Sequence, residues 1–356
     1  MVVPKALGQC AFGICLVCSL FPAWLVAVVA KLISFCLPGD RRAAFERILG
    51  RLLIVLVVLC WRLLFLLCAW VRIDVFQQEG DGPFLGEPGK PAVLVMNHTS
   101  FLDAVLAPSL APLCRSPDVR VLVANYVFDI PLLSSVMRGI GLPEVPFKGS
   151  AGDFGNMAVE KELMDVRLQA FCDHVKSGGV GAWFPEGLRN RGNPEVLQEF
   201  RAGAFAVPAQ ADVEIWCCAA VGCNVSWPLK ALMGGCPARI GLKVFRLTDS
   251  SHAWLASQNL NSADERTKAV RLAGLAKDAM QEAIHELVAK GFSAKGAASS
   301  ASVACEACDA VLHRSNRIDV QGRAGLLSSC RLGYIISLRQ LVSSVGLRGL
   351  SAPTLA

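Results

Sequence analysis

Two long apolar runs dominate the hydrophobic pattern near the N-terminus. The run from Cys10 to Ala30 contains no charged residue, and the run from Leu52 to Val71 contains only Arg62. Each run matches the roughly 20 residues with which an α-helix crosses the hydrocarbon core of a bilayer. The pattern therefore predicts two membrane-embedded helices, which form an N-terminal anchor over residues 1–75.

The segment between the runs bears on membrane topology. Pro38-Gly39-Asp40 predicts a helix stop, and the loop expected after it is basic. By the positive-inside rule such a loop prefers the cytosol, and two full spans would place the bulk of the chain across the membrane from it. A non-spanning hairpin is the alternative, because Lys31 and Arg62 are costly inside a bilayer. A cleaved signal peptide fits less well, since a second apolar run follows. The basic residues of the expected loop are Arg41, Arg42, Arg47 and Arg51.

Short apolar runs of strand length follow a turn-rich linker at residues 77–90. Helical segments are expected between and after them, and this alternation predicts an α/β fold with a mixed or mostly parallel sheet flanked by helices. The last predicted helix has Ser262 and Glu265 in capping-box spacing. We expect a soluble domain at residues 76–292 and a low-complexity tail at residues 293–356. The predicted strands are Ala92–Met96, Val119–Ala124, Val180–Phe184, Glu214–Val221 and Ile240–Leu247, and the predicted helices are Asp153–Val175 and Ala263–Lys290.

Composition and charge favour a lipid-associated protein. Hydrophobic residues make up 53% of the chain, and the net charge is +6. The positive charge suits anionic lipid headgroups and phosphorylated substrates, and no nucleic-acid partner is needed to explain it. Cysteines are frequent in the apolar anchor, where they act as small apolar residues, so no disulfide framework is predicted. Cys305 and Cys308 have metal-site spacing without a second pair, and no metal site is predicted.

The segment after the first predicted strand carries candidate chemistry. It reads Asn97-His98-Thr99-Ser100-Phe101-Leu102-Asp103. If Ser100 caps a helix, Asp103 falls at the third helical position, where its side chain can meet His98. A carboxylate on one ring nitrogen orients a histidine as a general base. A capped helix beside a bystander histidine has the same pattern, so this pair alone is weak evidence.

A second candidate segment, Trp183 to Arg191, follows another predicted strand. Pro185 breaks the strand and Gly187 turns the chain, so that Glu186 and Arg189 lie at the carboxyl edge of the sheet, where α/β proteins bind ligands. The planar fork of Arg189 suits a phosphate group. Glu186 can fix the loop or bind a substrate hydroxyl. The alternative is an ordinary surface turn with a solvated charge pair.

Together these segments resemble the glycerolipid acyltransferase family, in particular 1-acylglycerol-3-phosphate acyltransferases, over roughly Leu52 to Gly291. The resemblance implies a catalytic dyad of His98 and Asp103 and makes residues 76–292 an acyltransferase domain. It also implies an acceptor-phosphate motif at residues 184–189, with leucine in place of the usual threonine at position 188. The implied substrate-binding residues are Lys148, which stands where the family has arginine, and Glu186, Gly187 and Arg189.

The same resemblance implies the reaction. A fatty acyl group moves from acyl-CoA, as co-substrate, to the free hydroxyl of a lysophospholipid, and 1-acyl-sn-glycerol 3-phosphate gives phosphatidic acid. No cofactor or metal is expected. The expected partners are acyl-CoA, the lysophospholipid acceptor and membrane lipids. We expect an integral or monotopic protein of the endoplasmic reticulum, with the plastid envelope as the alternative. Another lysophospholipid or glycerol 3-phosphate as acceptor, and a catalytically silent lipid-binding protein, remain open.

Overall fold

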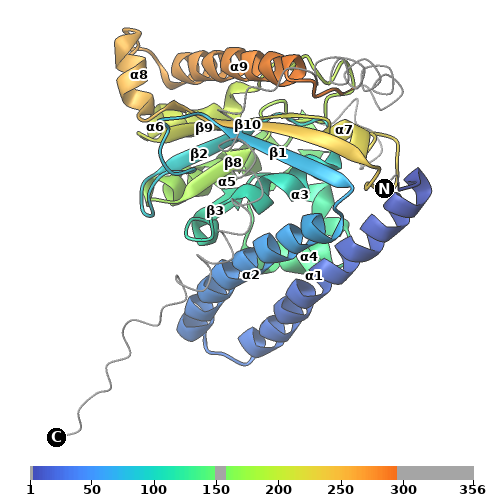
Figure 1. Cartoon of the computed structure of the whole chain (residues 1–356). Helices are drawn as coiled ribbons and strands as arrows, with labels where there is room; N and C mark the ends of the chain where they lie inside the picture. Colours follow the sequence, from blue (N-terminus) through green and yellow to red (C-terminus); the bar gives the residue numbers. More distant parts are fainter. Residues whose placement is uncertain (1–2, 149–157, 295–356) are drawn as a thin grey trace, which may run out of the picture. The chain divides into compact units, whose positions relative to one another are not determined.

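A mixed β-sheet forms the centre of the part of the chain that the computed structural model describes, residues 3–148 and 158–294. The sheet lies between two layers of helices (Figure 1). In sheet order its strands are β1 (Val71–Gln77), β10 (Ala238–Thr248), β9 (Glu214–Val221), β2 (Ala92–Met96), β8 (Val180–Trp183) and β3 (Val119–Val121). Strand β10 runs antiparallel to β9, and the other neighbouring pairs are parallel. The predicted α/β fold with a mixed sheet is therefore confirmed.

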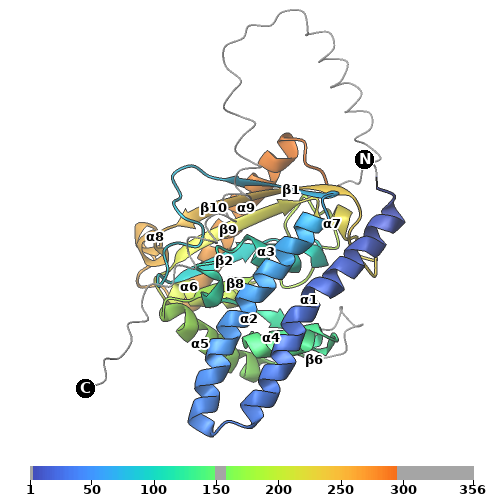
Figure 2. The ribbon, with the colours of Figure 1, turned by 60° about the horizontal axis from the view of Figure 1, so that its bottom comes forward.

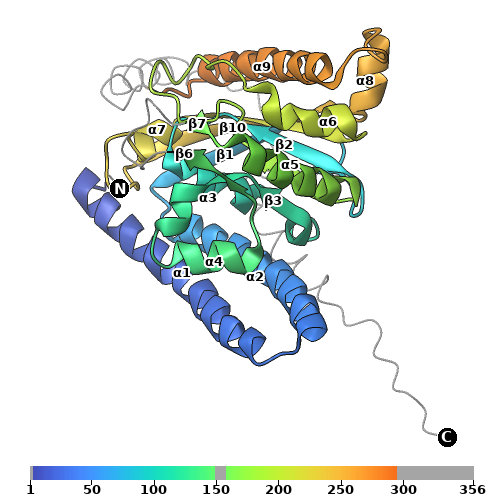
Figure 3. The ribbon, with the colours of Figure 1, turned by 180° about the vertical axis from the view of Figure 1, so that it is seen from behind.

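Helices cover both faces of this sheet (Figure 3). The face that includes Leu94 and Met96 of β2 packs against α1 (Lys5–Phe35), α2 (Gly39–Leu67), α3 (Phe101–Leu110) and α4 (Leu133–Ile140). The face that includes Val93 and Val95 packs against α5 (Lys161–Lys176), α6 (Ala206–Gln210) and α9 (Glu265–Ala289). Because successive strand residues point to opposite faces, β2 and β9 are buried along their whole length and read as continuous apolar runs.

Short elements complete the described chain. Two small sheets pair β4 (Val123–Ala124) with β5 (Glu144–Val145) and β6 (Phe147–Lys148) with β7 (Ala158–Val159). The other helical segments are α7 (Cys223–Ser226), α8 (Ser251–Ser257), η1 (Ser116–Asp118), η2 (Asn125–Asp129) and η3 (Ala202–Phe205).

The strand predictions agree with the structure where the apolar run is continuous. The predicted strands at 92–96 and 214–221 coincide with β2 and β9. The predicted 119–124 strand divides into β3 and β4, which belong to different sheets. Strand β1 was not predicted, because it directly follows the apolar anchor run and only its first residue is buried. Its place at the sheet edge, paired with β10 alone, explains this mixed pattern.

The two N-terminal helices form a hairpin, and α1 and α2 lie side by side (Figure 2). The predicted basic loop is wrong, because the chain turns at residues 36–38 and Pro38 is the N-cap of α2. Proline suits the start of a helix as well as its end, since its ring fixes φ near the helical value. The four arginines therefore lie on α2, where Arg51 contacts Asp118 through Nη2 and Oδ1 at 3.1 Å.

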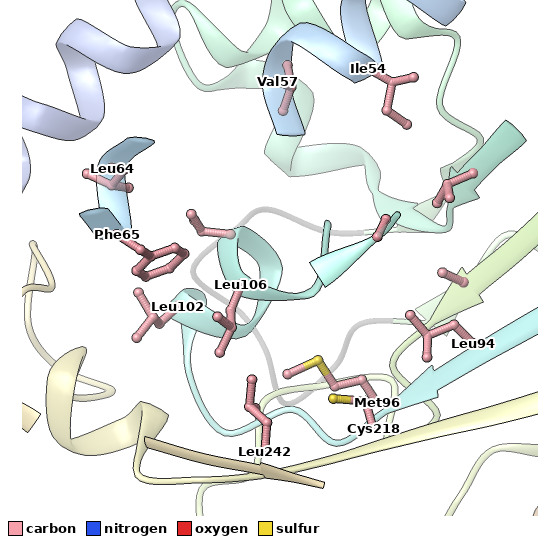
Figure 4. Packing of buried hydrophobic residues seen from close by; sticks show 14 of the residues in the cluster. Ile54, Val57, Leu64, Phe65, Leu94, Met96, Leu102, Leu106, Cys218 and Leu242 are labelled. Carbon is pink, nitrogen blue, oxygen red and sulfur yellow. The ribbon is translucent and has the colours of Figure 1, made fainter. Parts of the chain in front are cut away.

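Helix α2 belongs to the domain core as well as to the hairpin. Both helices are long and apolar enough to cross a membrane, but 44% of the apolar window of α2 is buried, against 28% in α1. Figure 4 shows Leu64 and Phe65 of α2 beside Leu102 and Leu106 of α3, above Met96 of β2. Helix α3 is thus held between α2 and the sheet.

Arg62, the single charge in the second apolar run, has a defined role in this packing. Its Nε donates to the carbonyl of Ser109 at 2.9 Å, and its Nη2 donates to that of Ala111 at 2.7 Å. These carbonyls lie at the C-terminal end of α3, where main-chain oxygens lack helical partners. The charge therefore binds α2 to α3.

The hairpin also exposes a broad apolar surface. The exposed large apolar side chains are Leu7, Ile14, Val17, Phe21, Leu25, Val26, Val29, Leu32, Ile33 and Phe35 on α1, and Ile48, Leu52, Leu63, Leu66 and Leu67 on α2. Many exposed large apolar side chains on two neighbouring helices are typical of contact with a membrane or a protein partner.

Two of the predicted helices require correction. The predicted helix at 153–175 is observed as α5 from Lys161, and residues 153–157 lie outside the described chain. Helix α9 is capped by Asp264, whose Oδ1 accepts from the Thr267 amide at 2.9 Å, and the predicted Ser262 cap is wrong. Asp264 lies directly before the first helical residue, which is the capping position. The tail prediction and the Cys305–Cys308 pair fall outside the described residues.

Two glycines give a matched stability test of this packing. Gly274 is exposed on α9 and has open space where a methyl group would be added, so Gly274→Ala should raise the free energy of unfolding by about 0.5–1 kcal/mol. A methyl group on Gly241 would lie 2.6 Å from the Phe292 ring, so Gly241→Ala should lower the free energy of unfolding by about 1–3 kcal/mol. Thermal unfolding in detergent would measure both, and equal effects would contradict the packing described.

Candidate active site

The candidate residues gather at one edge of the sheet. Strands β9, β2 and β8 are adjacent and parallel, so their carboxyl ends lie together. The segments that leave these ends contain His98, the loop at residues 184–191, and α7. Asn97 extends the β2–β9 pairing with its side chain, which donates to the Ala220 carbonyl at 3.0 Å and accepts from the Ala220 amide at 2.8 Å. The chain therefore leaves the sheet at His98, in a fixed position.

The structure brings His98 and Asp103 into contact. Their Nδ1 and Oδ2 atoms are 3.2 Å apart. Ser100 is the N-cap of α3, and a capping box with Asp103 is present, as the sequence predicted. The same Oδ2 accepts from the amides of Thr99 at 2.6 Å and Ser100 at 2.8 Å. Asp103 is fully buried. The cap thus fixes the carboxylate, the carboxylate holds Nδ1 of His98, and Nε2 is the nitrogen left to exchange a proton.

The loop after β8 fixes the histidine from the other side. The ring of Phe184 stacks on the His98 ring with centroids 4.1 Å apart and planes 16° apart. The His98 amide donates to Glu186 Oε1 at 2.8 Å, and the His98 carbonyl accepts from the Asn190 amide at 2.6 Å. The two sequence motifs are therefore one structural unit.

Glu186 is buried inside that unit. Only 3% of its surface is exposed, and its Oε2 accepts from the Gln198 amide at 3.1 Å. Burial raises the pKa of the Glu186 carboxyl, and the two amides and the nearby His98 oppose that rise. The sequence allowed two roles for Glu186, fixing the loop or binding a substrate hydroxyl. Since both carboxylate oxygens bind main-chain amides, the geometry favours the first role.

The raised pKa of Glu186 gives a pH-dependent stability prediction. A carboxyl whose pKa is raised on folding binds its proton more tightly in the folded chain, so its contribution to stability is full below its ordinary pKa and is lost as pH rises through the raised value. Glu186→Gln carries no charge at any pH. The stability of the wild type minus that of Glu186→Gln should therefore decrease as pH rises through this window, as measured by thermal unfolding. A difference that grows with pH would contradict this assignment.

Arg189 lies next to this unit with part of its hydrogen-bonding capacity unused. The guanidinium carbon is 3.6 Å from the centroid of the Phe101 ring. Its Nη1 is buried and has no hydrogen-bond partner within the described chain. Burial lowers the pKa of the guanidinium; the nearby Tyr126 opposes this shift, and the neighbouring Arg191 adds to it. A buried guanidinium nitrogen without an acceptor is a good site for an anion.

Gly187 and Lys148 contribute differently. Gly187 has a φ of +72°, and a β-carbon there would lie 2.6 Å from Arg201 Nε, so the turn before Arg189 requires glycine. Lys148 is exposed at the end of β6, at the border of the described residues. Its neighbour Phe147 accepts from Asn125 Nδ2 at 3.1 Å. The structure thus assigns Gly187 to the loop backbone, and the phosphate-binding role of Lys148 stays a prediction.

Sequence reasoning missed two aromatic residues of the site. Phe101 lies under Arg189, and Tyr126 on η2 contacts the Phe147 ring with centroids 6.4 Å apart. Burial raises the pKa of the Tyr126 phenol, and the positive charges of Arg189 and Arg191 oppose that rise. Tyr126 belongs to neither motif, so no spacing in the sequence links it to them. Phe101 lies inside the first motif, but its pairing with Arg189 is tertiary.

Buried thiols lie behind the dyad. Asp103 Oδ1 is buried without a nitrogen or oxygen partner in the described chain. Burial and then the charge of Asp103 raise the pKa of Cys218 to about 12 and that of Cys223 well above its ordinary value. Both thiols therefore stay protonated and uncharged at neutral pH. Both are packed in the core.

The start of α3 offers few amides for a developing oxyanion. The amides of Thr99 and Ser100 bind Asp103, and the Leu102 amide binds Ser100 Oγ at 3.1 Å. The cap therefore uses the donors that an oxyanion at the helix start would need. Within the described residues, no group of three His, Cys, Asp or Glu side chains is arranged to hold a metal ion.

The chain is similar to known acyltransferases. Residues 76–221 match a family model described as Acyltransferase, and this range includes all six predicted site residues. The chain is 31% identical over 130 residues to the 1-acyl-sn-glycerol-3-phosphate acyltransferase LPAT1, chloroplastic, of Arabidopsis thaliana. That match covers 35% of this chain and 30% of the relative, so the chain spans less than a third of the relative's length.

The fold also resembles a solved structure. The 1-acyl-sn-glycerophosphate (LPA) acyltransferase PlsC from Thermotoga maritima superposes with a TM-score of 0.53 at 16% identity. The match covers 80% of this chain and 96% of PlsC. At this identity the likeness concerns the fold, and it includes most of the described residues.

Proposed function

We propose that the chain transfers a fatty acyl group from acyl-CoA to 1-acyl-sn-glycerol 3-phosphate, forming phosphatidic acid. The match of residues 76–221 to the Acyltransferase family model supports this reaction class. The observation that carries this proposal is the contact of His98 Nδ1 with a capped, buried Asp103, beside a buried Arg189 nitrogen without an acceptor in the described chain. The names of LPAT1 and PlsC support the same acceptor.

The proposed mechanism is direct transfer between two bound substrates. His98 Nε2 takes the proton of the acceptor hydroxyl while that oxygen attacks the thioester carbonyl carbon. The tetrahedral intermediate collapses with cleavage of the carbon–sulfur bond. The coenzyme A thiolate leaves, takes the proton back from His98 and is released as the thiol. Asp103 stabilises the imidazolium in between. Ser100 is not a nucleophile in this scheme, since its hydroxyl donates to the Trp227 carbonyl at 2.8 Å and accepts from the Leu102 amide.

Arg189 is proposed to hold the phosphate of the acceptor. A guanidinium presents a planar fork of donors that fits phosphate oxygens. Its loop is the one that fixes His98, through Glu186 and Asn190. Binding the phosphate therefore places the acceptor hydroxyl relative to the base, and such positioning lowers the entropic part of the barrier.

Membrane association is part of the proposal. The exposed apolar side chains of α1 and α2 support it, and lipid hydroxyls lie at the membrane surface. The endoplasmic reticulum stays our prediction for the organelle. The chloroplastic relative makes the plastid envelope the alternative to test, by localisation of the full-length tagged chain.

The decisive experiment is an acyl-transfer assay on membranes that contain the full chain. Labelled acyl-CoA is offered with 1-acylglycerol 3-phosphate, and membranes from the same cells without the protein are the control. Labelled phosphatidic acid is the expected product. Transfer to a lysophospholipid without a free phosphomonoester, or to glycerol 3-phosphate, would replace the proposed acceptor. Absence of transfer to all of these acceptors would favour a catalytically silent lipid-binding protein.

A further inference from the structure

Arg189 is held by an aromatic ring and not by a carboxylate. Its guanidinium carbon lies 3.6 Å from the Phe101 ring centroid, and none of the ion pairs within the described chain includes Arg189. A carboxylate would bind the edge of the guanidinium and use its N–H donors. A ring attracts the flat face of the cation and leaves the edge available. The buried Nη1 donor, which suits a phosphate oxygen, therefore has no acceptor within the described chain.

The Phe101 ring is in turn fixed by Trp227. The centroids of the two rings are 5.7 Å apart. Trp227 is held through its carbonyl, which accepts from Ser100 Oγ at 2.8 Å, and through its indole nitrogen, which donates to the Ala231 carbonyl at 3.2 Å. Phe101 itself is 36% exposed, so the ring is only partly enclosed by the protein. The Trp227 ring is one of the groups that it contacts.

The loop that follows Trp227 is docked on α1. Phe12, which is fully buried, meets the Trp227 ring edge-on with centroids 6.0 Å apart. Gln9 Nε2 donates to the Met233 carbonyl at 3.0 Å. A β-carbon on Gly235 would lie 2.1 Å from Phe12 Cβ, so loop and helix are in close contact. A continuous series of contacts therefore links the first apolar helix to Arg189.

We propose that Phe101 is a positioning residue for Arg189 in recognition of the acceptor phosphate, and that Trp227, held by α1, fixes the Phe101 ring for this purpose. The proposal rests on the proposed function, because it assigns Arg189 to a phosphate. Phe101 acts on the guanidinium alone. Its loss should therefore weaken acceptor binding without changing the base or the binding of the acyl donor.

Steady-state kinetics of two variants separate this role from a merely structural one. Phe101→Leu keeps an apolar side chain without the aromatic face, and its KM for 1-acylglycerol 3-phosphate should rise by about 3- to 30-fold. The kcat and the KM for acyl-CoA should stay within about twofold of wild type. Phe101→Tyr keeps the ring and should restore the wild-type KM. The control is Phe76→Leu on β1, which removes a ring that lies under the Lys290 ammonium. This variant should leave kcat and both KM values unchanged.

The double variant Phe101→Leu/Arg189→Ala decides whether the effect passes through Arg189. Its KM for 1-acylglycerol 3-phosphate should be no higher than that of Arg189→Ala alone, because the two residues act as one unit. Three results would overturn the proposal: additive losses in the double variant, equal effects of the leucine and tyrosine variants, or a matching rise in the KM for acyl-CoA.

A binding measurement keeps this test separate from the proposed function. Thermal unfolding of the full chain in detergent is followed with 1-acylglycerol 3-phosphate and with 1-acylglycerol, which lacks the phosphate. The phosphate-bearing lipid should stabilise wild type and Phe101→Tyr more than Phe101→Leu, whether or not the wild type transfers acyl groups. Equal stabilisation of all three proteins overturns the role of Phe101. Wild-type transfer only to acceptors without a phosphomonoester overturns the proposed function instead.

Discussion

Replacing His98 with alanine should lower the rate of acyl transfer by about 10²–10⁴-fold while leaving the fold intact. The base is the one group that the proposed mechanism requires to exchange a proton. The His98 side chain is 15% exposed and has Nδ1 bound to Asp103, so its removal leaves a small gap at the site edge. The measurement is labelled transfer to 1-acylglycerol 3-phosphate at matched protein level. Wild-type rates in His98→Ala would exclude His98 as the base.

Asp103→Asn provides the second arm of the same test. The carboxylate orients His98 and also caps α3, so this variant should lose both activity and stability. Asp264→Asn is the matched control, because Asp264 caps α9 with a similar hydrogen bond and lies outside the site. The double variant His98→Ala/Asp103→Asn should be no slower than His98→Ala, since the two residues act together. Multiplied losses would show that Asp103 acts on catalysis independently of His98.

Replacing Arg189 with alanine should lower kcat/KM for 1-acylglycerol 3-phosphate by about 10- to 100-fold, the range expected when charge-assisted hydrogen bonds are lost. The buried Nη1 has no partner in the described chain, so the loss should appear only with a phosphate-bearing acceptor. Arg189→Lys should recover part of the activity, because an ammonium keeps the charge but not the planar fork.

Transfer to 1-acylglycerol is the internal control for Arg189. The ratio of the two kcat/KM values measures phosphate recognition and cancels any general loss of folded protein. Arg271→Ala, which removes an arginine on the exposed part of α9, should leave the ratio unchanged. An equal loss for both acceptors in Arg189→Ala would show that Arg189 supports the loop and does not recognise phosphate.

The His98–Asp103 pair and the core strands could be predicted from local sequence. The capping box at Ser100 and Asp103 is a short-range motif, so its geometry follows from spacing alone. The continuous apolar runs of β2 and β9 result from burial on both faces. The glycine turn and the arginine of the second loop were also visible, because turn residues and charges are local features.

Tertiary contacts explain what the sequence did not reveal. Both oxygens of Glu186 bind amides of residues far apart in the chain, and no local spacing identifies them. The pairing of Phe101 with Arg189 joins segments from two different strands. The start of α2 was misread because a proline after an apolar run fits either a helix end or a helix start.

The docking of α1 on the loop after Trp227 has a consequence for synthesis of the protein. Gln9 and Met233 are 224 residues apart in the chain. At about 5–20 residues per second, the helix therefore emerges from the ribosome roughly 10–45 s before the loop that it binds. During that interval Phe12 and Gln9 lack their final contacts. The contacts from α1 through Trp227 to Phe101 therefore form after the N-terminal helices have been synthesised. A nascent chain that stalls before Trp227 contains His98 and Arg189 but lacks the ring that contacts Phe101.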